Sequence, residues 1–179
     1  MPTKSSTNHY GTVAVTIHWI SALLIFTLIG SGFRASGMED AAAAKVAILQ
    51  VHVPLGVTIL LLTLLRVIWW VFADKKPRPV PMPTWQERSS RAVHLLFYVV
   101  ILGMAASGIG MMVLSGAGPV LFGGSSETLP DFWKFLPRVP HGIGARVMIA
   151  LLVVHAGAAL YHHFFKRDGL LRRMWFGTG

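Results

Sequence analysis

The stretch that decides the fold is residues 140–165, PHGIGARVMIALLVVHAGAALYHHFF, an apolar run interrupted by histidines. Two of these, His141 and His155, are fourteen residues apart. On an α-helix this spacing falls about 40° short of four full turns and rises about 21 Å, so both imidazoles lie on nearly the same face at two depths. Titratable groups inside a membrane are costly and usually mark functional sites. The stripe therefore predicts two stacked cofactors along one membrane-spanning helix.

The composition is that of an integral membrane protein. Of the 179 residues, 54% are hydrophobic and 13% are charged, and the mean hydropathy is +0.60. Soluble domains of this size rarely carry so little charge. The absence of cysteine excludes disulfides, iron–sulfur clusters and thiolate ligation of haem. We expect one transmembrane domain over residues 1–179, in which the net charge of +9 reports topology rather than nucleic-acid binding.

Four apolar segments are long enough to cross a hydrocarbon core of about 30 Å. They are residues 11–33, 46–72, 92–114 and 140–165, which predicts an all-α, four-helix membrane bundle without internal repeats. The segment 74–91 contains four prolines and is expected to be an extended, polyproline-like strap. In the loop 115–139, the sequence LPDFWKFL at 129–136 predicts a short interfacial helix. Residues 1–10 are expected to be disordered or to lie on the surface.

The orientation of the bundle follows from its basic residues. The N-terminal tail, the proline-rich linker, the C-terminal tail and Arg66 carry eleven Lys and Arg and three acids. The other side carries five Lys and Arg and four acids. The positive-inside rule then places both termini in the cytoplasm, so the chain is expected in the bacterial cytoplasmic membrane with N-in and C-in topology.

This topology pairs four histidines by depth. His18 lies near the inner end of the first span and His155 toward the inner end of the fourth, so these two meet in the inner leaflet. His52 begins the second span and His141 the fourth, so these two meet in the outer leaflet. An imidazole pair with no further protein ligand fits haem iron, which takes two axial ligands, and fits structural zinc poorly because zinc takes four. Without a Cys-x-x-Cys-His motif the haems are expected to be of the non-covalent b type.

Further residues in the spans are candidates for a role at the haems, and Arg66 and His94 have two possible interpretations each. Arg66, fourteen residues after His52, lies at the inner depth and is expected to pair with a haem propionate, or else to anchor at the interface. Gly32, fourteen after His18, leaves room for porphyrin at the outer depth. His94 is expected to support a ligand or to lie at the interface. A lone intramembrane histidine is often only a helix contact, and a small channel or transporter is a further, non-redox reading.

Four segments of the chain together resemble the bacterial four-helix cytochrome b561 family, which includes the cytochrome b subunits of hydrogenases. They are TIHWISALLIF, QVHVPLGVTILLLTLLRVIWW, RAVHLLFYVVILGMAASGIGMM and VPHGIGARVMIALLVVHAGAALYHHFFKRDGLLRRM, which cover most of the chain. The resemblance implies two b haems whose iron ligands match His18, His52, His141 and His155. Its best-described member type is a superoxide oxidase, which takes an electron from superoxide at the periplasmic haem and passes it to ubiquinone.

The predicted function is therefore single-electron transfer across the membrane, with superoxide or another periplasmic donor and with ubiquinone as acceptor. The alternative is an electron-transfer subunit that serves a partner dehydrogenase or a soluble redox protein. A quinone site is expected near the inner haem, at His162, His163, Lys166 and Arg167, although the two histidines are equally well read as interfacial side chains. The sequence leaves the oligomeric state open.

Overall fold

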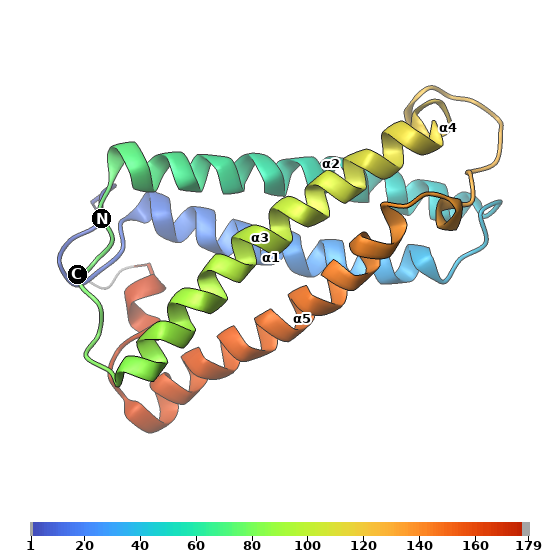
Figure 1. Cartoon of the computed structure of the whole chain (residues 1–179). Helices are drawn as coiled ribbons and strands as arrows, with labels where there is room; N and C mark the ends of the chain where they lie inside the picture. Colours follow the sequence, from blue (N-terminus) through green and yellow to red (C-terminus); the bar gives the residue numbers. More distant parts are fainter. Residues whose placement is uncertain (1, 177–179) are drawn as a thin grey trace.

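The computed structural model describes residues 2–176, and all the regular structure in that range is helical (Figure 1). Four long helices form the bundle: α1 (Thr12–Ser36), α2 (Ala43–Ile68), α3 (Thr84–Ser115) and α5 (Arg138–Tyr161). The π-helical turns η1 (Trp69–Ala73) and η3 (His162–Lys166) continue α2 and α5. With these turns the helices are 25, 31, 32 and 29 residues long and apolar enough to cross a membrane. The structure thus confirms the predicted all-α fold, and its four long apolar helices are consistent with a four-helix membrane bundle.

The helices pack as two antiparallel hairpins. The helix α1 packs on α2, and α3 packs on α5, while α2 and α3 join the two hairpins. Among the described residues, α1 makes little direct backbone contact with α5. The first and the last of the described residues lie at the same end of the bundle, which we call the terminal end (Figure 1). The other, which we call the loop end, carries the connections 37–42 and 116–137.

The bounds of the third helix differ from the sequence expectation. The strap predicted over 74–91 is extended only as far as Pro83, and α3 begins at Thr84. The prolines stop at Pro83, which is the N-cap, and the polar residues that follow carry no helix breaker. The polar first turns of α3 therefore extend beyond the apolar segment that predicted the span. The helix ends where Gly116 adopts a left-handed conformation with φ of 66°.

The loop end is closed by short elements. The helix α4 (Gly118–Phe122), which the sequence did not predict, buries Leu121 against α2, and the Gln50 side-chain amide donates to the Leu121 carbonyl at 2.7 Å. The interfacial helix expected over 129–136 is wrong in extent, because only Phe132–Lys134 forms a 3-10 turn, η2. The N-cap of this turn is Asp131, whose side chain accepts from the Trp133 N–H at 3.0 Å, and its C-cap is Phe135, where the backbone is extended.

At the terminal end, residues 2–10 lie on the surface and are tied to the bundle, whereas Met1 lies outside the described residues. The backbone N–H of Ser5 donates to both oxygens of Asp74, at 3.1 and 3.0 Å. Burial would raise the pKa of the Asp74 carboxyl, but hydrogen bonds from Ser5, Lys75 and Trp69 outweigh it and hold this pKa below its usual value. The C-terminal segment joins the same assembly, because Trp19 Nε1 donates to the Met174 carbonyl at 2.8 Å.

Candidate functional site

The structure brings the four sequence-predicted histidines together in the two expected pairs. At the loop end, the rings of His52 on α2 and His141 on α5 face each other with centroids 6.4 Å apart and planes inclined by 64°. At the terminal end, His18 on α1 and His155 on α5 have ring centroids 6.2 Å apart and planes inclined by 60°. All four side chains are half-buried. Each pair joins α5 to a helix of the other hairpin.

In the loop-end pair, hydrogen bonds determine which ring nitrogen faces the gap. His141 Nδ1 lies 3.1 Å from the Met104 carbonyl, which only accepts, so this nitrogen carries the hydrogen. The Ser107 hydroxyl lies 2.9 Å from the same nitrogen and itself donates to the Met104 carbonyl. His52 Nδ1 is 2.8 Å from Ser31 Oγ, whose own hydrogen is directed to helix carbonyls. Both imidazoles therefore keep the Nε2 lone pair available for a metal ion.

Two glycines make room for these rings. A Cβ at Gly32 would lie 3.1 Å from His52 Cε1, and one at Gly108 would lie 3.3 Å from His141 Cε1. Each glycine directly follows the serine that bonds the same ring. A cavity of about 660 Å³ surrounds the loop-end pair, within the range of cofactor and ligand sites. Its lining is mostly apolar, and its charged residues are three acids and three bases: Glu39, Asp40, Asp131, Lys45, Arg138 and Arg146.

The terminal-end pair is surrounded differently. Arg66 Nη2 lies 3.4 Å from His18 Nδ1. This contact is long for a hydrogen bond, and in it only the guanidinium can be the donor. His155 is bracketed by two rings of α3, His94 at 5.3 Å and Phe97 at 5.4 Å between centroids, both nearly perpendicular to it. His94 Nδ1 is fixed by the Ser90 carbonyl at 2.6 Å. His94 thus supports His155 directly, which was one of its two sequence readings, although its side chain is also exposed.

An apolar layer separates the two pairs. It is formed by Ile25, Ile59 and Met148, which are all buried and in mutual contact. Each follows a histidine of the pairs by seven residues, a spacing that returns to the same helix face about 10.5 Å farther along. The two pairs therefore lie at two levels of the bundle with close-packed hydrophobic side chains between them.

The two hairpins repeat the same pattern, which the sequence analysis did not detect. His18 precedes Ser31-Gly32 by thirteen residues on α1, and His94 precedes Ser107-Gly108 by thirteen on α3. On the partner helices, fourteen residues separate His52 from Arg66 and His141 from His155. The contacts match as well, because serine and glycine meet His52 in one hairpin and His141 in the other. The loop-end pair therefore joins equivalent positions of the repeat, and the terminal-end pair joins non-equivalent ones.

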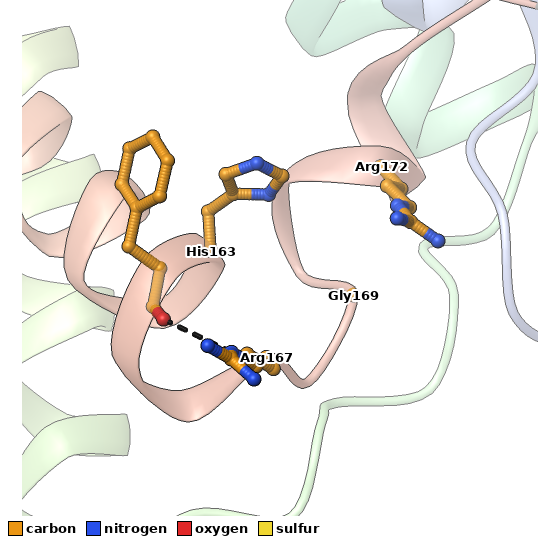
Figure 2. Close-up of a pocket in the computed structure, with 5 residues that line it drawn as sticks. His163, Arg167, Gly169 and Arg172 are labelled. Atoms are coloured by element: carbon orange, nitrogen blue, oxygen red, sulfur yellow. Dashed lines mark hydrogen bonds between the residues drawn. The ribbon is translucent and has the colours of Figure 1, made fainter.

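Of the four residues expected near a quinone, only His163 and Arg167 line the same pocket. His162 is 8% exposed, and its Nδ1 pairs with the Asp168 carboxylate. Burial would raise the pKa of Asp168, but hydrogen bonds from His162 and the Leu170 N–H outweigh it and lower this pKa. His163 and Arg167 instead line a separate pocket of about 320 Å³ with Arg172 (Figure 2). Lys166 is exposed and is not among the residues that line this pocket.

Sequence reasoning missed the serines and the carbonyl that orient the loop-end imidazoles. The two Ser-Gly dipeptides, each thirteen residues after a histidine, were the available signal for Ser31 and Ser107. The Met104 carbonyl left no signal, because any residue at that position supplies the same acceptor.

Comparison with known proteins gives matches over nearly the whole chain. The family model described as prokaryotic cytochrome b561 matches residues 9–177. Cytochrome b561 homolog 1 of Escherichia coli (strain K12) is 25% identical over 171 residues, which cover 93% of this chain and 97% of the relative. Cytochrome b561 homolog 2 of the same strain is 23% identical over 190 residues, covering 97% and 95%. A protein of Yersinia pestis named probable superoxide oxidase CybB is 25% identical over 172 residues, covering 92% and 94%.

Proposed function

Since this chain belongs to the prokaryotic cytochrome b561 family, it is a membrane electron-transfer protein, and we propose that it carries two b haems, one at each histidine pair. Family membership by itself implies haem b. The geometry of the histidine pairs is the observation that supports two haems and their two positions. In each pair the two imidazoles would hold the haem iron through one ring nitrogen each, and bonds of about 2.1 Å to both rings would need ring centres roughly 6 to 6.5 Å apart. The centroid separations of 6.2 and 6.4 Å fit this spacing.

The surroundings of the pairs also suit haem. Each pair offers two imidazoles without a third metal-ligating side chain among the described residues, which suits an iron that already has four porphyrin nitrogens. The missing side chains at Gly32 and Gly108 leave space beside the rings, as a flat macrocycle requires. When bound, haem supplies one-electron redox chemistry that the side chains do not provide. The chain's own contribution is to hold the imidazoles in place and to exclude water between the two levels.

Arg66 is the proposed partner of a haem propionate at the terminal end. Its guanidinium is half-buried and makes only a long contact with His18. A buried cation is strongly stabilised by a carboxylate, and arginine binds carboxylates through two parallel hydrogen bonds. We place the terminal end in the cytoplasm, because it carries most of the Lys and Arg of the chain.

The loop end, which then faces the periplasm, is the proposed place where superoxide gives up its electron. Arg138 and Arg146 converge there beside His141, since a Cβ at Gly142 would lie 3.0 Å from one Nη1 and 3.6 Å from the other. The cavity lining as a whole is balanced in charge, but two guanidiniums side by side next to His141 attract a small anion to that ring. The relative named as a probable superoxide oxidase supports the same donor. Each superoxide loses one electron and becomes O₂.

The proposed acceptor is ubiquinone at the terminal end. Two electrons and two protons convert a quinone to a quinol, so the site needs a proton donor. Of the four residues expected there, His162 is the one that is buried, seven residues beyond His155 on the same helix face. Its contact with Asp168 joins it to a more exposed carboxylate. Of these four residues we therefore assign the role of proton donor to His162, and we assign to Asp168 the role of positioning its imidazole.

Rapid mixing with superoxide tests this function. We expect superoxide to reduce the haems of the purified protein and added ubiquinone to reoxidise them, and both steps are followed in the haem absorption spectrum. The double variant Arg138→Gln/Arg146→Gln removes the charges beside His141 and is expected to slow reduction about tenfold at low salt, with less effect at high salt. The matched control Arg34→Gln removes an exposed loop-end charge that does not line the cavity.

The result distinguishes the alternative function. Reduction that is equally fast in the double variant and in the control would show that these arginines do not steer superoxide. A haem-loaded protein that superoxide does not reduce would instead be an electron-transfer subunit for a partner dehydrogenase or a soluble redox protein. A purified protein without a b-type spectrum would contradict both functions.

A further inference from the structure

A basic pocket lies at the terminal end, outside the histidine pairs. Its lining is His163, Phe164, Arg167, Gly169 and Arg172, and its volume is about 320 Å³. Figure 2 shows His163 on the last helical turn, Arg167 at the start of the following loop and Arg172 beyond Gly169. The pocket therefore lies where the last span leaves the apolar part of the membrane.

The lining is cationic and lacks a carboxylate. His163, Arg167 and Arg172 bring imidazole and guanidinium donors to it, and none of its five lining residues is acidic. The acid of the same loop, Asp168, is directed away, because its oxygens pair with His162 and accept from the Leu170 N–H at 3.0 Å. Arg167 Nε lies 3.4 Å from the Phe164 carbonyl, which holds the guanidinium beside the helix end.

The loop that carries these cations has a defined shape. Arg167 and Gly169 both adopt left-handed backbone conformations, with φ of 52° and 77°. Farther along, the Tyr10 N–H donates to the Arg173 carbonyl at 3.3 Å, and Arg173 Nε donates to the Asn8 carbonyl at 2.6 Å. The cations are thus presented by a loop fixed at both ends, which lowers the entropy lost when a ligand binds.

The surface at the end of the last span, next to the pocket, is apolar and aromatic. Phe164 is 61% exposed and Phe165 is 78% exposed, and Tyr161 stacks on Phe165 with centroids 5.6 Å apart. A ligand with an anionic head group and apolar chains is complementary to a cationic pocket beside an aromatic surface. A quinone head group is neutral, so several cations would not stabilise it. Basic pockets beside transmembrane helices are a recognised way of binding lipid phosphate.

We propose that this pocket binds the phosphate group of an anionic phospholipid from the surrounding leaflet. Arg167 and His163 donate to the phosphate oxygens, and the exposed aromatic rings contact the acyl chains. Free inorganic phosphate offers the same head chemistry without the chains. The proposal does not rest on the proposed redox function, because the lining includes neither a histidine of the pairs nor His162, the proposed proton donor.

Native mass spectrometry of the detergent-purified holoprotein tests the site. Phosphatidylglycerol and phosphatidylcholine are titrated separately against the wild type, Arg167→Gln, Arg167→Lys and Arg88→Gln. Arg88 is an exposed arginine at the start of α3 that does not line the pocket, so its variant is a matched control for the loss of one charge. We expect tight binding of one phosphatidylglycerol, about tenfold weaker binding in Arg167→Gln, and near-normal binding in Arg167→Lys and Arg88→Gln.

Competition identifies the source of the phosphate. Displacement of phosphatidylglycerol by millimolar inorganic phosphate would support the head site and show that the phosphate suffices, and a lack of displacement would show that the acyl chains are needed. Equal binding of both lipids, or equal losses in Arg167→Gln and Arg88→Gln, would overturn the proposal. Displacement of the lipid by a short-chain ubiquinone would also overturn it. An unchanged haem spectrum in each variant verifies that the protein is folded.

Discussion

The loop-end pair and the terminal-end pair each consist of two imidazoles, but the two pairs differ in the positions of the repeated hairpins from which these imidazoles come. His52 and His141 occupy equivalent positions of the two hairpins, and a Ser-Gly dipeptide contacts each ring. His18 and His155 occupy non-equivalent positions. The counterpart of His18 is His94, and that of His155 is Arg66.

The difference separates two ways of orienting an imidazole. Hydrogen bonds fix the loop-end rings and also determine which nitrogen carries the hydrogen. At the terminal end, His155 is held between the rings of His94 and Phe97, and His18 faces a guanidinium. A repeated hairpin can thus build one symmetric and one asymmetric site, and the asymmetric one has Arg66 where the repeat of the other hairpin has His155.

The largest expected effect comes from removing one histidine at each level. His141→Ala is expected to lose the loop-end haem and to retain the other, and His155→Ala to do the reverse, because each removes one of two axial ligands. Haem content by pyridine haemochrome should fall to about half in each variant, with different residual spectra. Equal spectra, or complete loss of haem from a protein that remains helical by circular dichroism, would contradict two separate sites.

A smaller effect is expected from the serines that orient the loop-end rings. Ser31→Ala removes the hydrogen-bond partner of His52 Nδ1, and loss of such a partner typically weakens metal binding by about 10–100-fold. Ser107→Ala should cost less, because the Met104 carbonyl still accepts from His141. The rate of haem transfer to apomyoglobin measures both. Thr27→Ala, which removes an exposed hydroxyl of α1, is the control. Equal rates in Ser31→Ala and in this control would show that the hydrogen bond is dispensable.

The smallest expected effect is that of added methyl groups. In Gly32→Ala and Gly108→Ala the new Cβ would lie 3.1 and 3.3 Å from an imidazole carbon, so the ring must shift by a few tenths of an ångström. Gly30→Ala and Gly103→Ala are matched controls, since a Cβ there meets no atom within 4 Å. Electron paramagnetic resonance should show altered g-values only for the loop-end haem in the first two variants. A change at the terminal-end haem would contradict the separation by the apolar layer.

Much of the fold was predictable because membrane spans are defined by local composition. The apolar segments located four helices, and the remaining errors lie in the connections. Prolines and polar residues there set the bounds, as at Thr84, where α3 begins earlier than its apolar residues indicate. The candidate site was predictable in part, since helical periodicity gives the face and depth of each histidine along its own helix.

The sequence by itself determined the four spans, the two levels of histidines and their pairing by depth. Only the tertiary structure decided which atoms meet across helices: Ser31 with His52, and His94 with His155. It also showed that His162 pairs with Asp168 in the segment that follows α5. Periodicity fixes positions along one helix, whereas distances between helices depend on packing and rotamers, which no single segment encodes. The repeat of the two hairpins became visible for the same reason, because it is carried by matching contacts and by only a few shared residues.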